Sequence, residues 1–222
     1  MTTLTTRRFD SCAALEQALA ERLARALGAR GASAVMLSGG TTPLPAYRAL
    51  AARPPQHDDR LHILYTDDRY VPENSEASNY HQIAPLTDTL ALPPESLLRV
   101  RTTLPLEEAA ADYDRQLTTL LSSGVHIGLG LLGLGADGHT CSLFTAADLE
   151  RARGRYAIPV QRPDGMAAVS VTPELLATVR EPLFVVAGSG KERALGALMA
   201  RDPSLTAWRA VQGSSAVELW MA

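Results

Sequence analysis

Hydrophobic residues recur along this chain with two alternating periods. Four leucines stand at every fourth position between Asp10 and Gly28, which predicts an amphipathic helix capped at Asp10 or Ser11 and stopped at Gly28. Further helical patterns cover 44–50, 80–86, 107–122, 173–179 and 191–198. Short apolar runs predict strands at 33–37, 61–65, near Val100, and at 125–132, 156–160, 167–171, 183–187 and 216–220, the last as an edge strand. This alternation predicts an α/β fold, in which a mainly parallel sheet carries helices on both faces.

Length and composition narrow the class of protein. A chain of 222 residues predicts one domain, 1–222, and its 46% hydrophobic and 20% charged residues are ordinary for a globular protein with a sizeable core. The net charge of −3, without runs of like charge, speaks against nucleic-acid and anionic-membrane partners. No apolar run reaches the roughly 18 residues that a membrane-spanning helix needs.

The cysteines and the N-terminal residues favour a cytoplasmic protein. Only Cys12 and Cys141 are present, which is a poor basis for a disulfide framework. The first nine residues lack the apolar core of a signal peptide. Cys and His residues show no metal-binding spacing, so we expect no metal, and the loop after the strand 33–37 lacks the G-x-G-x-x-G pattern, which argues against a dinucleotide cofactor.

The strongest candidate for chemistry follows the strand 125–132. Gly133 and Gly135 break this strand, and Asp137 and His139 stand two apart in the turn that follows. Open α/β sheets bind ligands where buried strands end in polar turns. Histidine titrates near neutral pH, so His139 is a candidate base and Asp137 a candidate acid beside it.

A second candidate is the small polar loop between the strand 33–37 and the helix that follows. Its backbone N–H groups, hydroxyls and helix N-terminus suit a phosphate, although such a loop is as often a plain turn. The candidate ligands are Ser38, Gly39, Gly40, Thr41 and Thr42. No Gly-Lys-Ser/Thr follows, so the loop is not a Walker loop.

Charged residues follow two other strands. Asp67, Asp68 and Arg69 end the strand 61–65, either as a structural ion network or as part of a site. Lys191 follows a strand and opens a helix, where its charge opposes the helix dipole. This placement is favourable if an anion lies between the ammonium group and the N-terminus of the helix.

These segments carry a family resemblance. Gly133-Leu-Gly-Ala-Asp-Gly-His-Thr-Cys-Ser-Leu-Phe144 resembles G-x-G-x-D-G-H-T-A-S-L-F of the 6-phosphogluconolactonases. Four further segments resemble motifs of the same family. Residues 38–43 resemble its G-G-S/T-T/S-P loop, and residues 67–72 resemble its D-E-R-x-V-P. Residues 78–80 match its S-N-Y, and residues 188–191 match its G-x-x-K. The resemblance spans about residues 35–200 and implies a three-layer α/β/α Rossmann-like fold shared with sugar-phosphate deaminases and isomerases.

The resemblance also implies roles for single residues. His139 is the general base that activates water, Asp137 orients it or a substrate hydroxyl, and Arg69 faces the substrate. Asp67 joins the loop 38–42 and Lys191 among the candidate substrate-binding residues. The implied reaction is hydrolysis of 6-phospho-D-glucono-1,5-lactone to 6-phosphogluconate in the oxidative pentose phosphate pathway. We expect the protein to be a monomer or weak homodimer that acts on a small sugar phosphate.

Three departures from the family pattern affect these expectations. Asp68 replaces a glutamate, and Cys141 replaces a small residue. Ala168 stands where the family has an arginine that holds the substrate phosphate. Either Arg162 takes over this task, or the phosphate depends on Lys191 and the loop 38–42.

Other functions remain open at this point. The related glucosamine-6-phosphate deaminases share the D-G-H core but have an acidic residue shortly after it, where this chain has Phe144. Cys141 could act as a thiol nucleophile, although a small filler residue fits better. A non-catalytic sugar-phosphate binder is the third alternative.

Overall fold

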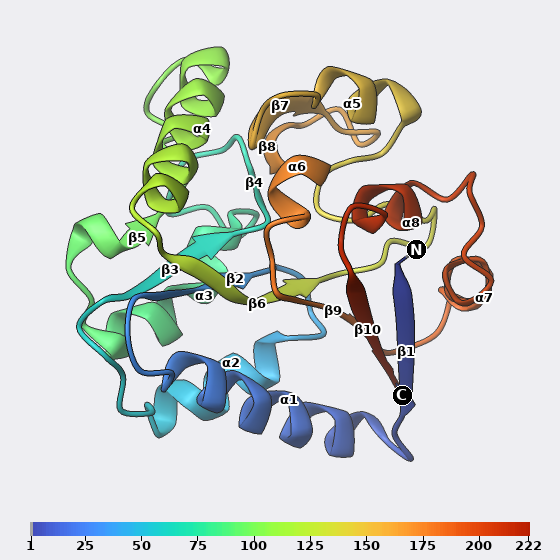
Figure 1. Ribbon diagram of the computed structural model, residues 1–222, viewed down its shortest axis with the longest axis horizontal. Helices are drawn as coiled ribbons and strands as arrows, with labels where there is room; N and C mark the ends of the chain where they lie inside the picture. Colours follow the sequence, from blue (N-terminus) through green and yellow to red (C-terminus); the bar gives the residue numbers. More distant parts are fainter. Residues whose placement is uncertain (1) are drawn as a thin grey trace.

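The computed structural model describes residues 2–222, and its centre is a seven-stranded sheet (Figure 1). The strands are β1 (Thr3–Arg8), β2 (Ser33–Leu37), β3 (Leu61–Tyr65), β5 (Leu97–Leu98), β6 (His126–Leu132), β9 (Glu181–Val186) and β10 (Ala216–Met221). They lie in the order β1-β10-β9-β6-β2-β3-β5, and every neighbouring pair is parallel. The predicted α/β fold with a mainly parallel sheet is therefore confirmed.

Both faces of the sheet are buried. Along β2, Val35 and Leu37 pack into one hydrophobic cluster, whereas Ala34 and Met36 pack into the other. Successive side chains of a strand point to opposite faces, so a strand covered on both sides is apolar throughout. This burial explains why the central strands appear in the sequence as uninterrupted apolar runs.

Three helices cover the first face: α1 (Cys12–Leu27), α2 (Leu44–Ala52) and α3 (Asn79–Leu90). The predicted apolar stripe of α1 consists of Leu15, Leu19, Leu23 and Leu27, all of which are buried. Ser11 is the N-cap, and its hydroxyl accepts a hydrogen bond from the backbone N–H of Ala14. Full burial of a leucine side chain stabilises the folded state by about 1.5–3 kcal/mol, so this stripe holds α1 against the sheet.

The second face carries helices and a smaller sheet. The helices are α4 (Leu106–Ser122), α5 (Ala146–Arg151), α6 (Pro173–Leu176), α7 (Glu192–Met199) and α8 (Thr206–Val211). The smaller sheet consists of β4 (Asp67–Arg69), β8 (Ala167–Val171) and β7 (Ala157–Gln161), in this order and antiparallel. It lies beside α4 in Figure 1.

The structure corrects several boundaries. β10 is not an edge strand, because β1 pairs with its outer side. The strand near Val100 is β5, at Leu97–Leu98, and it follows a short 3₁₀ helix at Pro94–Ser96. The helix predicted over 80–86 extends over Asn79–Leu90, with Pro85 inside it. No helix within residues 2–222 has the length and apolarity to cross a membrane.

The connectivity of the sheet reverses next to β2. From β2 the chain moves outward to β3 and β5, and it then returns to place β6 on the other side of β2. Such a switch point leaves a crevice at the carboxyl ends of the strands, where open α/β sheets bind ligands. The loops after β2, β3, β6 and β9 open at this edge.

Candidate functional site

A cavity of about 270 Å³ lies at this edge of the sheet. All predicted site residues except Asp137 line it. They are Ser38, Gly39, Gly40, Thr41 and Thr42 after β2, Asp67 and Arg69 in β4, His139 after β6, Arg162 after β7 and Lys191 after β9. Their positions span more than 150 residues of sequence, and the switch point brings them together.

His139 is held by Asp137 in the turn after β6. Its Nδ1 lies 2.5 Å from Asp137 Oδ1, and its backbone N–H donates to the same oxygen at 3.2 Å. Burial alone would raise the pKa of Asp137, but the hydrogen bond and charge of His139 outweigh it and lower that pKa. With Nδ1–H donated to the carboxylate, Nε2 keeps its lone pair for a substrate or a water molecule.

Two glycines make this turn possible. A methyl group on Gly135 would overlap the imidazole of His139, so only glycine leaves room for the ring. Gly138 has φ +88°, a conformation that favours glycine, and its carbonyl accepts a hydrogen bond from the backbone N–H of Ala207 at 2.9 Å. The ring of Phe144 packs against the imidazole, with 4.3 Å between the ring centroids.

The loop after β2 forms the opposite wall of the cavity. Gly40 has φ +92°, and Tyr47 of α2 donates its hydroxyl to the carbonyl oxygen of Ser38 at 2.9 Å. A side chain at Gly39 would overlap the amide of Asn79. The loop is therefore packed closely against the start of α3 while its own backbone faces the cavity.

Arg69 reaches the cavity from β4, and Asn79 holds it. One guanidinium N–H of Arg69 donates to Asn79 Oδ1. Asp68, which replaces the family's glutamate, caps α3: its Oδ1 accepts from the Asn79 backbone N–H at 2.6 Å, and its Oδ2 accepts from the Ser78 hydroxyl at 3.0 Å. Burial raises the pKa of Asp68 to about 6, against the opposing effect of these hydrogen bonds.

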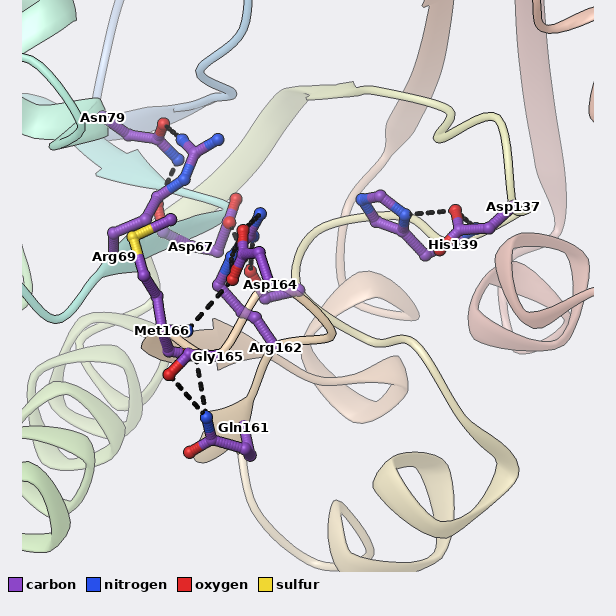
Figure 2. Close-up of polar contacts among 11 residues, drawn as sticks. Asp67, Arg69, Asn79, Asp137, His139, Gln161, Arg162, Asp164, Gly165 and Met166 are labelled. Atoms are coloured by element: carbon purple, nitrogen blue, oxygen red, sulfur yellow. Dashed lines mark hydrogen bonds and ion pairs between the residues drawn. The ribbon is translucent and has the colours of Figure 1, made fainter.

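Arg162 lies in the cavity but is already bound to a carboxylate. Its Nε and Nη2 donate to Asp164, and Nη1 lies 3.3 Å from the hydroxyl of Ser142. Ser142 is fully buried and donates to Asp67 at 2.7 Å. Ala168, the position of the family arginine, is buried in β8 opposite Arg69. Figure 2 shows Arg162 and Asp164 between the Arg69–Asn79 and His139–Asp137 pairs.

Lys191 is the single lysine of the chain. It lines the cavity at the start of α7, and burial lowers the pKa of its ammonium group. No carboxylate within residues 2–222 forms an ion pair with it. Cys141 also lines the cavity, and burial raises the pKa of its thiol, which opposes formation of a nucleophilic thiolate.

Two residues of the site were not predicted as site residues. Asn79 belongs to the Ser78-Asn-Tyr80 piece and lines the cavity, and Ser142 lies beneath it. Both residues lie within sequence segments that match motifs of the family, and this match is the signal by which the sequence could have identified them. Within the described part of the chain, no three His, Cys, Asp or Glu side chains gather closely enough to hold a metal ion.

A parallel α/β sheet whose switch point opens into a cavity lined by one histidine, two arginines and one lysine defines a class of proteins that bind small anionic ligands. Comparison with known proteins makes the assignment specific. The family model of the glucosamine-6-phosphate isomerases/6-phosphogluconolactonase matches residues 7–220. The chain therefore belongs to this family.

Individual relatives agree with this assignment. The chain is 34% identical to the 6-phosphogluconolactonase of Synechocystis over 82% of this chain and 77% of that protein, and 35% identical to the human one over 82% and 75%. The structure of the Thermotoga maritima 6-phosphogluconolactonase superposes with a TM-score of 0.80 at 27% identity, covering 100% of this chain and 99% of that one. A monomeric glucosamine-6-phosphate deaminase shares the fold, with a TM-score of 0.82 at 15% identity over 98% and 96%.

Proposed function

We propose that this protein hydrolyses 6-phospho-D-glucono-1,5-lactone to 6-phosphogluconate in the oxidative pentose phosphate pathway. The observation that carries the proposal is the His139–Asp137 pair, which places a base in the same cavity as three cationic side chains. The relatives named as 6-phosphogluconolactonases support it, and the region that the family model matches, residues 7–220, contains every residue that lines the cavity.

His139 acts as the general base. Asp137 accepts the Nδ1 proton, so Nε2 is the atom that takes a proton from water as the water attacks the lactone carbonyl. The same proton then moves to the ring oxygen as the carbon–oxygen bond breaks. Asp137 keeps the ring oriented and favours the imidazolium that forms between these two steps.

The cations handle the negative charges of the substrate. Arg69 stabilises the oxyanion that develops on the carbonyl, together with backbone donors of the glycine turn after β6. Lys191 and the loop 38–42 hold the phosphate, and Arg162, which is paired with Asp164, contributes less from the same cavity. Asp67, which accepts hydrogen bonds from Thr66 and Ser142, lies at the wall where substrate hydroxyls would face.

The deaminase alternative lacks its acidic residue here. The position five after His139 is Phe144, and its ring packs on the imidazole. The next acid, Asp148, caps α5 through Thr145 and pairs with Arg151 at 2.7 Å, so it is used in the helix and does not line the cavity. This arrangement favours hydrolysis over deamination.

An assay with two substrates tests the proposal. Freshly generated 6-phosphogluconolactone should be hydrolysed much faster than the spontaneous reaction, whereas glucosamine 6-phosphate should not be converted. Turnover of glucosamine 6-phosphate alone would favour the deaminase. Binding of both compounds without turnover of either would identify a sugar-phosphate-binding protein.

The proposal has three further parts. The reaction as written uses no metal or cofactor, and its partner is a small sugar phosphate. The active species is a monomer or weak homodimer. A cytoplasmic location is supported by the two free thiols, Cys12 and Cys141, which suit a reducing compartment.

A further inference from the structure

We propose that Asn79 is a positioning residue for Arg69 and couples it to the loop that holds the phosphate. This inference rests on the proposed function, in which Arg69 stabilises the oxyanion. Asn79 lies at the first position of α3, is 1% exposed and lines the cavity. It connects β4 with the loop after β2.

The side chain of Asn79 uses both ends of its amide. Its Oδ1 accepts from the guanidinium of Arg69, and its Nδ2 donates to the carbonyl oxygen of Asp67 at 2.9 Å (Figure 2). The reversed amide would turn N–H groups toward the guanidinium and an oxygen toward the Asp67 carbonyl. Both contacts would then be repulsive, so the amide has one favourable orientation and fixes where the guanidinium lies.

The start of α3 fixes the position of Asn79 itself. Its backbone N–H donates to Asp68 Oδ1, while Asp68 Oδ2 accepts from the Ser78 hydroxyl and, at 3.2 Å, from the backbone N–H of Tyr80. Asp67, Asp68 and Arg69 are consecutive residues of β4. All three residues of β4 therefore form hydrogen bonds with the start of α3.

The loop after β2 completes the arrangement. Gly39 lies so close to the Asn79 amide that a methyl group in its place would overlap it. The Asn79 amide therefore lies between the guanidinium of Arg69 and the backbone of the Ser38–Thr42 loop, in close contact with both.

Removal of Asn79 should act on the chemical step through Arg69. In Asn79→Ala the guanidinium loses its acceptor and leaves its productive position, and misplacement by about 1 Å can cost on the order of 100-fold in rate. We expect kcat to fall about 10- to 100-fold, with a smaller change in KM. Asn74 lies on the preceding loop and is exposed, so Asn74→Ala is the matched control and should keep wild-type kinetics.

A double-mutant cycle separates positioning from a general structural role. It compares the wild type with Asn79→Ala, Arg69→Ala and the double variant, with thermal unfolding recorded for each. If Asn79 acts through Arg69, Asn79→Ala lowers kcat in the wild type but has little further effect in Arg69→Ala. Equal fold losses in both backgrounds would overturn the positioning role.

A chemical rescue gives a second measurement. Free guanidinium should restore part of the activity of Arg69→Ala, because Asn79 Oδ1 still offers a binding point, and it should restore less in the double variant. Equal rescue in both would overturn the inference. If Asn79→Ala does not fold, Asn79→Ser takes its place in both experiments.

The outcomes distinguish this inference from the proposed function. Wild-type turnover in Arg69→Ala would remove Arg69 from the reaction, and the role of Asn79 would be overturned with it. A damaging Arg69→Ala combined with additive losses would leave the proposed function intact and overturn only the positioning role.

Discussion

His139 and Cys141 lie two residues apart and both line the cavity, yet their surroundings differ in kind. His139 has a carboxylate partner and a free Nε2, which suits proton transfer. Cys141 has φ +53° and is packed among apolar side chains, and burial raises the pKa of its thiol. These two residues therefore form a natural pair of test and control substitutions.

We expect His139→Ala to fold and to lose most lactone hydrolysis, because removal of a general base typically costs about 10²–10⁴ in rate. Cys141→Ala should keep near wild-type activity. The measurement is kcat at neutral pH, corrected for spontaneous hydrolysis. If instead Cys141→Ala abolishes turnover in a folded protein, and thiol alkylation does the same to the wild type, the mechanism is covalent.

The two cationic candidates for phosphate binding, Arg162 and Lys191, differ in whether a carboxylate of the protein is already paired with them. Arg162 is paired with Asp164, whereas Lys191 has no carboxylate partner within residues 2–222. A bound phosphate dianion would therefore depend more on Lys191.

Lys191→Ala should weaken substrate binding by roughly 2–5 kcal/mol, the usual cost when a buried charge loses its partner. Arg162→Ala should cost much less. The measurement is kcat/KM of both folded variants. A larger loss in Arg162→Ala would show that this arginine has taken over from the position of Ala168, and wild-type values in both would place the phosphate elsewhere.

At the scale of elements, the buried parallel strands were predictable and the small antiparallel sheet was not. β7 and β8 were expected as strands, but their pairing with β4 depends on contacts between distant residues, which periodicity does not encode. β1 was missed because its Thr-Leu-Thr-Thr-Arg-Arg sequence is mostly exposed. α5 and α8, six residues each, are too short for a helical period to be visible.

The residues of the candidate site likewise divide into those that the sequence predicts and those that depend on tertiary contacts. The loops after β2, β6 and β9 could be located because each directly follows an apolar run. The contact between Asn79 and Arg69 could not be foreseen, since it depends on how the start of α3 docks against β4. The cap that sets this docking is Asp68, whose ionisation therefore links the two elements.

The buried Asp68 cap should make stability depend on pH in a specific direction. Its pKa is about 6 in the folded protein and has an ordinary value of 3.8, so the folded state binds more protons between these values. Its contribution to stability is present at low pH and is lost as the pH rises through 6. The full effect amounts to about 3 kcal/mol.

The measurement is the free energy of unfolding of wild type and Asp68→Asn by denaturant titration from pH 4.5 to 7.5. As the pH falls, the difference between them should move in favour of the wild type. The variant also changes the capping hydrogen bonds, but that change is a constant offset. Parallel curves across this range would contradict the raised pKa.

At the scale of the whole molecule, few features favour association with a second copy. Within residues 2–222, Met199 is the single large hydrophobic residue that is exposed, at 44%. The two edges of the main sheet are also protected. β5 has two residues, and β1 ends in Arg7 and Arg8, whose charges oppose pairing with another strand.

We therefore expect a monomer of 23.7 kDa at micromolar concentration, with at most weak dimerisation at higher concentration. Specific interfaces generally bury 1,200–2,000 Å² or more around an apolar centre, and scattered exposed apolar residues do not provide one. Size-exclusion chromatography with light scattering over a hundredfold range of concentration gives the mass directly. The kcat measured across the same range should stay constant, because His139, Arg69 and Lys191 meet in one cavity without a contribution from a second copy being needed to bring them together. A dimer that persists at nanomolar concentration, or activity that falls on dilution, would contradict this expectation.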